Sequence, residues 1–396
     1  MKIGLVTACY HPVINGVTRM VDLYKTHLEA RGHEVTIFTL GPPASPTEAS
    51  NIIRSPAISL GRDGYFFAPR YSRQAQSLLG EMDILHCHHL FMSVEMAHRY
   101  GRCPIVYTNH TRYDLYTAAY TPFSQATADA IMRHVWPRFA GFADVVVAPS
   151  AGVRDVMLDF GVKTPLEVIP NGVDLRPFLH KRSDKRPFTK ATLNLPPDAI
   201  VAAYVGRLAS EKSLDTLIEQ FAQASQQIPQ LQLLIVGKGA SLEPLKKQAQ
   251  ARNIAHKVHV LGGVAYNDVP NILAAADFFV TASVSEVHPL TVIEAMAAGL
   301  PIIGTQSPGL TETVESGKTG LLIAQPTNEL AKAIHTLATN HELRQQMGQA
   351  ARQASKRFDI TQTVDQTIAL YEKLRQTRPD LARRKPHGRW GWKLSL

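Results

Sequence analysis

The sequence predicts an α/β protein made of two Rossmann-like domains, and three observations lead to that prediction. The chain has 396 residues, which is more than one ordinary hydrophobic core holds, so two domains of roughly 150–200 residues are expected. Short β-rich apolar runs alternate with longer amphipathic segments, as in βαβ units whose parallel sheets are covered on both faces. The alternation occurs as two successive series, which favours two Rossmann-like domains.

The order of elements follows from the apolar runs. In the first series strands are expected at residues 3–7, 35–40, 84–87, 105–108, 145–148 and 167–169. In the second they are expected at 200–205, 231–236, 258–261, 278–282, 302–304 and 320–323. A turn-forming cluster at 170–174 ends a strand, so the N-terminal domain is expected at 1–170 and the C-terminal domain at 171–358. Residues 359–375 have helical spacing, and 376–396 form a basic, aromatic tail without a regular period.

Composition and charge restrict the class of protein. The net charge of +9 and the pI near 9.4 indicate an anionic partner: nucleic acid, an anionic lipid surface or a phosphorylated small molecule. Nucleic acid is the weakest of these because no zinc knuckle or RNP-like aromatic sequence is present. No apolar run reaches the ~18–20 residues that span a bilayer. The first residues read as a buried strand, and Cys9, Cys87 and Cys103 as reduced core thiols, so a cytoplasmic protein is expected.

Residues 285–299 carry the strongest functional signal. They place two carboxylates, Glu286 and Glu294, eight residues apart across a loop that leads into a helix, which Gly299 and Pro301 then end. A helix start offers unpaired N–H groups and a positive dipole end to an anion. Glu286 could instead cap the helix, whereas Glu294 lies in an apolar stretch where a carboxylate is costly unless hydroxyls or cations satisfy it. A nucleotide sugar would use both kinds of group.

Two loops, each after the first strand of a series, are candidates for phosphate binding. Gly16 would let backbone N–H groups approach a phosphate, although a turn that merely needs glycine explains it equally well. Arg207 and Lys212 lie on a loop that we expect to open onto the inter-domain cleft. Arginine can fork onto phosphate oxygens and lysine can act as a point charge. Glu211 beside Lys212 leaves open a solvated surface pair.

A histidine and several aromatic residues follow the strand at 105–108. His110 stands at the strand's carboxyl end, where it could touch a reacting centre, although a structural histidine is more common. Its neighbours Arg112, Tyr113 and Tyr116 suggest a wall that receives an amphipathic molecule. In the second series, the glycine turn that precedes Val264 could let a nucleobase stack against the backbone.

Together these motifs resemble those of the retaining family 4 (group 1) glycosyltransferases of GT-B fold, over nearly the whole chain. The Glu-x7-Glu element of Glu286 and Glu294 is the most specific part, and the Gly-Arg-Leu…Glu-Lys element that contains Arg207 and Lys212 comes next. The resemblance implies two Rossmann-like domains that face each other across a cleft. The first would bind the acceptor and the second the nucleotide sugar, and the helix at 359–375 would cross back onto the first domain.

The resemblance also implies roles for single residues. Arg207 and Lys212 would hold the donor diphosphate, and Glu294 the ribose hydroxyls. Glu286 and His110 would act at the transferred sugar, close to the anomeric carbon, as the catalytic residues. The expected donor-binding residues are Gly16, Arg207, Lys212, Val264, His288, Pro289, Leu290, Thr291 and Glu294. The expected acceptor-binding residues are Arg112, Tyr113 and Tyr116.

The sequence departs from the commonest family pattern after Glu286. Many members carry Gly-Phe-Gly there, whereas this chain has Val287, His288 and Pro289. Proline has no N–H group, so donors to a phosphate or sugar must come from its neighbours. The departure leaves the identity of the sugar open.

The stretch around His110 is similar to members that glycosylate diacylglycerol-type lipids and that dock on membranes through a basic, aromatic first domain. Tryptophan prefers the headgroup level, and basic residues prefer anionic leaflets. The residues that fit this pattern are Arg133, His134, Trp136, Arg138 and, in the tail, Trp390 and Trp392. Solvated charge and a disordered tail are the alternative. The expected location is peripheral, on the inner face of the cell membrane.

The resemblance therefore implies transfer of a hexose, with retention, from a nucleotide donor (UDP) to a diacylglycerol-type membrane lipid in glycolipid synthesis. No cofactor and no metal are expected, because no Asp-x-Asp motif or histidine cluster with ligand spacing occurs. A soluble sugar, a polysaccharide or a phosphoinositol is the alternative acceptor. A GT-B nucleotide-sugar epimerase would need an acid/base set that the sequence does not reveal, and a non-enzymatic nucleotide-sugar-binding regulator is the third alternative.

Overall fold

The computed structural model describes residues 1–43, 45, 47–61, 66–179, 188–325 and 329–377. Its contacts divide the chain into two compact units. Among the described residues, unit 1 contains Met1–His110, Ala126–Gly172 and Ile360–Thr377, and unit 2 contains Thr111–Gln125 and Val173–Asp359. The expected N-terminal domain ran without interruption to residue 170, whereas Thr111–Gln125 packs with unit 2. The basic, aromatic tail at 376–396 lies, after Thr377, outside the described residues.

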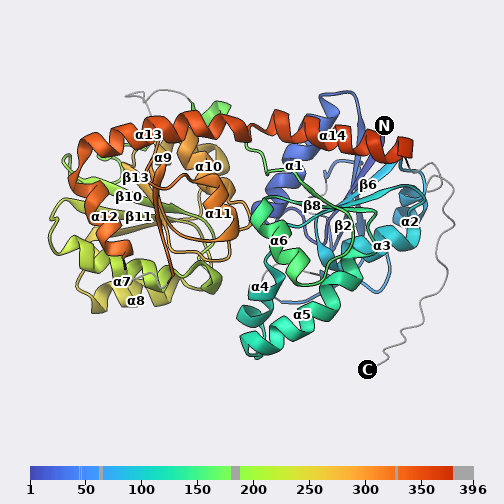
Figure 1. The fold of residues 1–396 in the computed structure, drawn as a ribbon, viewed down its shortest axis with the longest axis horizontal. Helices are drawn as coiled ribbons and strands as arrows, with labels where there is room; N and C mark the ends of the chain where they lie inside the picture. The colour runs from blue at the N-terminus through green and yellow to red at the C-terminus, as the bar shows by residue number, and fades with distance from the viewer. Residues whose placement is uncertain (44, 46, 62–65, 180–187, 326–328, 378–396) are drawn as a thin grey trace. The chain divides into compact units, whose positions relative to one another are not determined.

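Unit 1 is built on a parallel sheet with helices on both faces (Figure 1). Its sheet strands are β1 (Lys2–Val6), β2 (Glu34–Leu40), β3 (Ile52–Ser55), β6 (Ile84–Cys87), β7 (Ile105–Thr108), β8 (Val145–Ala148) and β9 (Leu166–Val168). A separate antiparallel pair consists of β4 (Ile58–Ser59) and β5 (Phe66–Phe67). The helices are α1 (Gly16–Glu29), α2 (Arg73–Leu79), α3 (Glu95–Tyr100), α5 (Gln125–Ala140), α6 (Ala151–Asp159) and α14 (Ile360–Thr377).

Unit 2 repeats this architecture on a second parallel sheet. Its strands are β10 (Ile200–Val205), β11 (Leu231–Val236), β12 (Val258–Gly262), β13 (Phe278–Thr281), β14 (Ile302–Thr305) and β15 (Gly320–Ile323). Its helices are α4 (Tyr113–Tyr120), α7 (Leu214–Ser225), α8 (Leu242–Ala251), α9 (Val269–Leu273), α10 (Leu290–Ala297), α11 (Pro308–Thr313), α12 (Leu330–Thr339) and α13 (His341–Ser355). Alternate residues of β10 enter two different hydrophobic clusters, with Ala203 in one and Ala202 in the other, so the sheet is covered on both faces.

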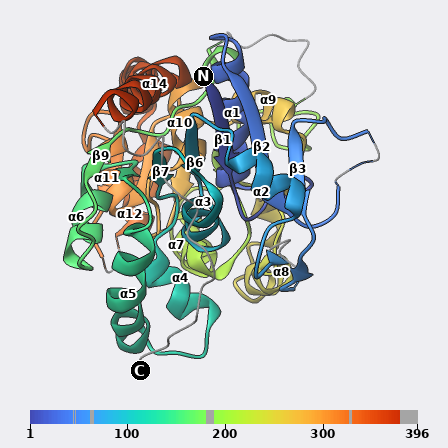
Figure 2. The same ribbon diagram turned by 90° about the vertical axis from the view of Figure 1, so that its right-hand side faces the viewer.

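The order of strands places one topological switch point in each unit. In unit 1 the order is β3-β2-β1-β6-β7-β8-β9, so the chain reverses direction of travel between β1 and β6 (Figure 2). In unit 2 the order is β12-β11-β10-β13-β14-β15, which puts the reversal between β10 and β13. In open parallel sheets, ligands bind outside the carboxyl ends of the strands at such a reversal. The loops after β1, β6, β10 and β13 are therefore where a site is expected.

The last helix belongs to the packing of unit 1. Tyr24 of α1 and Thr367 of α14 lie 3.3 Å apart through their hydroxyl oxygens. The hydroxyl of Tyr371 lies 2.6 Å from Nδ1 of His86 on β6. Both tyrosines are fully buried, so α14 closes one face of the unit 1 sheet.

The predicted fold class of two parallel Rossmann-like α/β units is confirmed. Strands β3, β4 and β5 were not predicted, because each is short and β3 contains the charged Arg54. In the described part of the chain, no helix has the length and apolar character needed to cross a bilayer.

Candidate functional site

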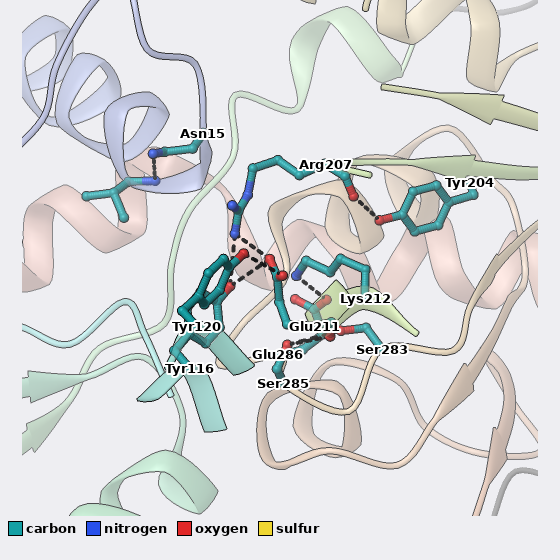
Figure 3. Close-up of polar contacts among 11 residues, drawn as sticks. Asn15, Tyr116, Tyr120, Tyr204, Arg207, Glu211, Lys212, Ser283, Ser285 and Glu286 are labelled. Carbon is teal, nitrogen blue, oxygen red and sulfur yellow. Dashed lines mark hydrogen bonds and ion pairs between the residues drawn. The ribbon is translucent and has the colours of Figure 1, made fainter. Parts of the chain in front are cut away.

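A buried ion pair spans the switch point of unit 2. Lys212, after β10, and Glu286, after β13, meet with Nζ and Oε1 2.8 Å apart, and their side chains are only 16% and 14% exposed (Figure 3). Burial is the largest influence and would lower the pKa of Lys212, but the Glu286 carboxylate together with Tyr116 and Tyr204 outweighs it, and the pKa is raised. Burial would raise the pKa of Glu286, but Lys212, with a hydrogen bond from Ser283, lowers it. Both groups are therefore charged at neutral pH.

Beside this pair, Arg207 takes part in a second charged cluster. Its Nη2 lies 2.6 Å from Oε1 of Glu211, whose side chain is 2% exposed, and donates to the Tyr116 hydroxyl at 3.1 Å. The hydroxyl of Tyr120 donates to Oε2 of Glu211 at 2.7 Å. A guanidinium held at one end by a buried carboxylate loses little side-chain entropy when it binds an anion. Arg207 is still 39% exposed, so a ligand can reach it.

Close backbone packing fixes the loop that carries Arg207. The N–H of Leu208 donates to the Lys238 carbonyl at 2.9 Å. A Cβ on Gly237 would lie 1.8 Å from the Gly206 carbonyl oxygen, and one on Gly239 would lie 2.1 Å from that of Leu208. Only glycine permits this approach. The Gly-x-Gly turn after β11 is thus a packing device that positions the Arg207 loop.

The loop after β13 is tied to the same place. The hydroxyl of Ser285 donates to the Glu211 carbonyl at 3.1 Å, and the Gly309 N–H donates to the Glu286 carbonyl at 3.1 Å. A Cβ on Gly309 would lie 2.0 Å from the Val287 carbonyl oxygen, so α11 presses directly on this loop. These contacts hold Glu286 against Lys212.

Helix α10 begins directly after this loop, as the sequence indicates. Its N-cap residue, Pro289, makes no side-chain cap hydrogen bond, and the first helical residues, Leu290 and Thr291, are partly exposed. Glu294 is 3% exposed and accepts a hydrogen bond of 2.7 Å from the Tyr266 hydroxyl. The Glu294 carboxylate therefore lies about one turn inside α10, on the same helix as the partly exposed residues at its start.

Two expected donor-binding side chains are internal. His288 is buried with its ring edge-on to Phe358, the ring centres 4.9 Å apart. Burial, with the nearby Arg357 charge, lowers the pKa of His288 to about 3, so its imidazole is neutral. Val264 is partly buried and packs against the main core of unit 2. These two side chains contribute to packing, and contact with a donor would come from the backbone beside them.

In unit 1, the glycine loop forms a capped helix start. The Asn15 side chain accepts hydrogen bonds from the N–H groups of Val17, at 2.9 Å, and Thr18, at 3.0 Å. Two of the N–H groups that we expected to approach a phosphate are therefore already satisfied. A Cβ on Gly16 would meet no described atom within 4 Å, so the fold itself does not require glycine there.

His110 stands in a stack of imidazole rings at the carboxyl ends of β6 and β7. Its Nε2 lies 3.0 Å from Nδ1 of His88, and the rings stack with centres 5.3 Å apart. The ring of His88 lies 4.3 Å from that of His86. Burial, followed by the neighbouring His89 and His86, lowers the pKa of His110 to about 3. His110 is therefore a neutral imidazole, able to donate one hydrogen bond and accept one.

The expected acceptor-binding residues have different surroundings. Arg112 forms a two-pronged ion pair with the buried Asp114, with Nε at 2.9 Å from Oδ1, so its charge is already used within unit 2. Tyr113 starts α4, which brings Tyr116 to Arg207. The structure thus joins Tyr116 to residues expected to bind the donor.

The expected membrane-facing cluster needs a correction. Trp136 is fully buried and packs against Phe160, with ring centres 5.5 Å apart. Arg133 pairs with Asp159 at 2.8 Å. Helix α5 turns its tryptophan into unit 1, so this indole cannot lie at a headgroup layer. Trp390 and Trp392 lie outside the described residues.

Sequence reasoning missed several members of the unit 2 site. Glu211 was considered only for a solvated surface pair with Lys212, whereas its side chain is buried and pairs with Arg207, four positions away. Tyr120 was expected only in the aromatic wall with Tyr116, and its hydroxyl instead donates to Glu211. Nothing in the sequence alone pointed to the other hydroxyl groups that complete the site, which belong to Tyr266, Ser283 and Ser285.

Comparison with known proteins assigns the chain to a family. Residues 14–176 match the family described as Glycosyltransferase Family 4, and residues 185–354 match Glycosyl transferases group 1. The chain is 30% identical over 360 residues to Alpha-monoglucosyldiacylglycerol synthase of Acholeplasma laidlawii, covering 87% of this chain and 89% of that protein. The chain belongs to the family 4, group 1 glycosyltransferases. The resemblance drawn from its motifs is confirmed at this level.

Other relatives of this glycosyltransferase carry names that refer to different acceptors. The Alpha-monoglucosyldiacylglycerol synthase of Streptococcus pneumoniae is 29% identical, covering 81% of this chain and 75% of that protein. A D-inositol 3-phosphate glycosyltransferase of Nocardia farcinica is 28% identical, covering 87% and 81%. Both names are those of glycosyltransferases, and they differ in the molecule that is glycosylated.

Solved structures support the GT-B architecture. Sucrose-phosphate synthase from Thermosynechococcus elongatus superposes with a TM-score of 0.77 at 24% identity, covering 95% of this chain and 100% of that chain. Anabaena HepE, solved with UDP and glucose, superposes with a TM-score of 0.76 at 23% identity, covering 94% and 100%. At these identities the likeness establishes the fold alone.

Proposed function

We propose that this glycosyltransferase moves a hexose from a UDP-sugar to a diacylglycerol-type lipid with retention at the anomeric carbon. The observation that carries the proposal is the buried Lys212–Glu286 pair beside Arg207, at the topological switch point of unit 2. The lipid acceptor is supported by the two monoglucosyldiacylglycerol synthases among the relatives, which align over 87% and 81% of this chain.

The proposed donor site uses preorganised charge. Arg207 and Lys212 would face the diphosphate, together with the uncapped start of α10. Each cation has a carboxylate partner at 2.6–2.8 Å, so a bound diphosphate shares the cation with that carboxylate. Glu286 would accept hydrogen bonds from hydroxyls of the transferred sugar, and Glu294 from those of the ribose.

In the proposed reaction, the bond between the anomeric carbon and the donor's phosphate oxygen breaks, and a bond to the acceptor's hydroxyl oxygen forms. The departing diphosphate takes the electron pair and, in a front-face attack, also the acceptor's proton. Arg207 and Lys212 would stabilise the negative charge as it develops. The neutral imidazole of His110 can donate a hydrogen bond to the sugar through its one N–H group. It lacks the second proton of an imidazolium, so it does not act as an acid. No metal is expected in this scheme, and the test is unchanged turnover in EDTA.

The transfer itself is tested with a panel of donors and two acceptors. UDP-glucose, UDP-galactose, UDP-N-acetylglucosamine and GDP-mannose are each incubated with diacylglycerol vesicles or with D-inositol 3-phosphate, and proton NMR reads the anomeric configuration of any product. We expect an α-linked glycolipid from a UDP-hexose. Product from the inositol phosphate alone would favour the second candidate, which rests on the D-inositol 3-phosphate glycosyltransferases among the relatives.

Donor binding is tested by calorimetry with UDP. Arg207→Ala should weaken binding by about 1.5–3 kcal/mol, because hydrogen bonds to a charged group are lost. Lys246→Ala is the matched control, since Lys246 is a half-exposed cation on α8 that pairs only with Glu243 in the described structure. Equal UDP affinity in Arg207→Ala and the parent protein would remove Arg207 from the proposed site.

The glycine loop of unit 1 offers a separate test. Gly16→Ala should leave the melting temperature unchanged, because the added Cβ has open space. If a ligand approaches this backbone, turnover should fall at least about tenfold, since a methyl group would then stand in its way. Full activity in this folded variant would reduce Gly16 to a simple turn residue.

Membrane contact, which the buried Trp136 cannot provide, would use exposed apolar side chains elsewhere on unit 1. Ile58 and Leu60 are 69% and 66% exposed, and Phe67, opposite Ile58 in the β4–β5 pair, is 37% exposed. We expect the protein to co-sediment with vesicles that contain anionic lipid, and Leu60→Asp to reduce the bound fraction. Absence of binding at low salt would favour an acceptor that is free in solution.

A further inference from the structure

A cavity lies at the edge of the unit 2 sheet opposite to Lys212 and Glu286. Its volume is about 980 Å³, and it is bordered by α9, the end of α10, α13 and the turn Arg176–Phe178. Asp277 and Leu300, which line it, stand just before β13 and β14, whereas the candidate site stands after β10 and β13. The eight residues of α10 separate the two places by about 12 Å. Helices α10 and α13 lie side by side (Figure 1).

The charge lining this cavity is predominantly positive. Arg344 and Arg352 come from α13, and His341 lies at the start of the same helix. Asp277 is the acidic residue among the lining residues, and its Oδ2 accepts from the Val201 N–H at 2.9 Å and lies 3.6 Å from Nζ of Lys190. The carboxylate is thus satisfied from outside the cavity, and the arginine charges are left with little compensation.

Both arginines have donors to spare. Nη1 of Arg344 donates to two carbonyls at the end of α12, at 2.6 and 2.8 Å, and Nη2 of Arg352 donates to the Ala298 carbonyl at 2.8 Å. A guanidinium has five N–H donors. Nε of Arg352 is buried and has no hydrogen-bond partner among the described residues. Burial lowers the pKa of Arg344 despite the opposing charge of Asp277, as expected for a cation that lacks a close anion.

The wall on the α9 side offers apolar surface from Pro270 and Ala274, which are partly exposed, beside the polar Asn267 and Asn271. Phe178 and Leu273 lie buried behind this wall. Pockets of roughly 300–1,000 Å³ with an apolar wall and a few directed polar groups are typical of small-molecule sites. A ligand that suits this cavity has a compact apolar body and one anionic group.

We propose that this cavity binds a small phosphomonoester, with its phosphate on Arg344 and Arg352 and its apolar body against Pro270 and Ala274. Phosphate matches two guanidinium groups better than a single carboxylate does, because three oxygens can accept from both forks. The site is separate from the proposed sugar-transfer site and does not depend on the reaction proposed for it.

Phenyl phosphate is a suitable probe, since it combines a phosphate with a small ring. Calorimetric titration of the full chain should show saturable binding, and inorganic phosphate and phenol, the two halves of the probe, should bind more weakly. Arg344→Gln should weaken phenyl phosphate binding by about 10- to 100-fold, the equivalent of one or two charge-assisted hydrogen bonds.

Two further variants test whether the probe binds in this cavity and not at the candidate donor site. Ala274→Trp places a bulky ring in the lining of the cavity while both arginines stay in the sequence. It should abolish binding, which covers the case in which Arg344→Gln disturbs the end of α12. Arg207→Ala, in the candidate donor site, should leave phenyl phosphate affinity unchanged. Binding that persists in Ala274→Trp, binding that is lost in Arg207→Ala, or non-saturable binding to the parent chain would each overturn the proposal.

Discussion

Replacing Lys212 by methionine should convert Glu286 from a stabilised carboxylate into a buried, unpaired one. In the parent protein the two side chains are 2.8 Å apart and largely buried. Removing one partner of such a pair typically costs about 3–5 kcal/mol, because the remaining charge has lost its water without gaining a counter-ion. Methionine keeps most of the side-chain volume, so the loss reports on charge more than on packing.

The pH sets a ceiling on this cost, since Glu286 can instead take up a proton. Each pH unit above the ordinary glutamate pKa of about 4.3 adds about 1.36 kcal/mol to the cost of protonation, which gives about 4.4 kcal/mol at pH 7.5 and about 1.6 kcal/mol at pH 5.5. In the variant the folded-state pKa of Glu286 is raised by burial, so the folded state binds the extra proton and stability falls as pH rises. Lys212→Met should therefore lose about 3–4 kcal/mol at pH 7.5 and clearly less at pH 5.5.

Urea unfolding followed by circular dichroism, at both pH values, measures these losses in the parent, Lys212→Met, Glu286→Gln and the double variant. The double variant should recover much of the stability lost by Lys212→Met, and its difference from the parent should be nearly independent of pH. Strictly additive single effects, or a Lys212→Met loss below about 1 kcal/mol at both pH values, would refute the reasoning that this pair is a buried, charged unit.

Two further predictions concern stability. Burial lowers the pKa of His86 and His110 to about 3 and that of His89 to about 4, so between about pH 6.5 and pH 4 only the unfolded chain binds these protons. Unit 1 should lose about 1.4 kcal/mol per histidine between pH 7.5 and pH 5.5, and constant stability in urea titrations would contradict this. Gly309→Ala places a Cβ 2.0 Å from the Val287 carbonyl oxygen, so it should destabilise unit 2 by about 1–3 kcal/mol and lower UDP affinity. A melting temperature equal to that of the parent would show that the contact relaxes freely.

The repeating elements of the fold could be predicted because they are local. Strands such as those at 145–148 and 200–205 are continuous apolar runs, which are typical of buried parallel strands. The loops that carry Lys212 and Glu286 could also be placed, since any loop after the carboxyl end of a switch-point strand faces the same edge. Their direct pairing across 74 positions depends on the order of strands, which the sequence pattern does not reveal.

Side-chain direction was the part that the sequence could not supply. Trp136 was expected at a membrane surface from its basic neighbours, but the face of α5 that carries it is set by packing against Phe160. Tyr116 was assigned to an acceptor wall, and it contacts Arg207, which is 91 positions away in sequence. In both cases the residue type suggested a role, but the tertiary contacts of the side chain determine what it can bind.

The place of Tyr371 has a consequence for how the chain is made. Its ring is fully buried and its hydroxyl lies 2.6 Å from His86 on the fourth strand of the unit 1 sheet order. During synthesis, residues 1–172 leave the ribosome first, yet the helix that carries Tyr371 emerges only after all of unit 2. The second unit can therefore finish folding while the first still exposes the surface that α14 will occupy. If synthesis stops before residue 360, the chain lacks α14, and the face of unit 1 that this helix covers stays exposed.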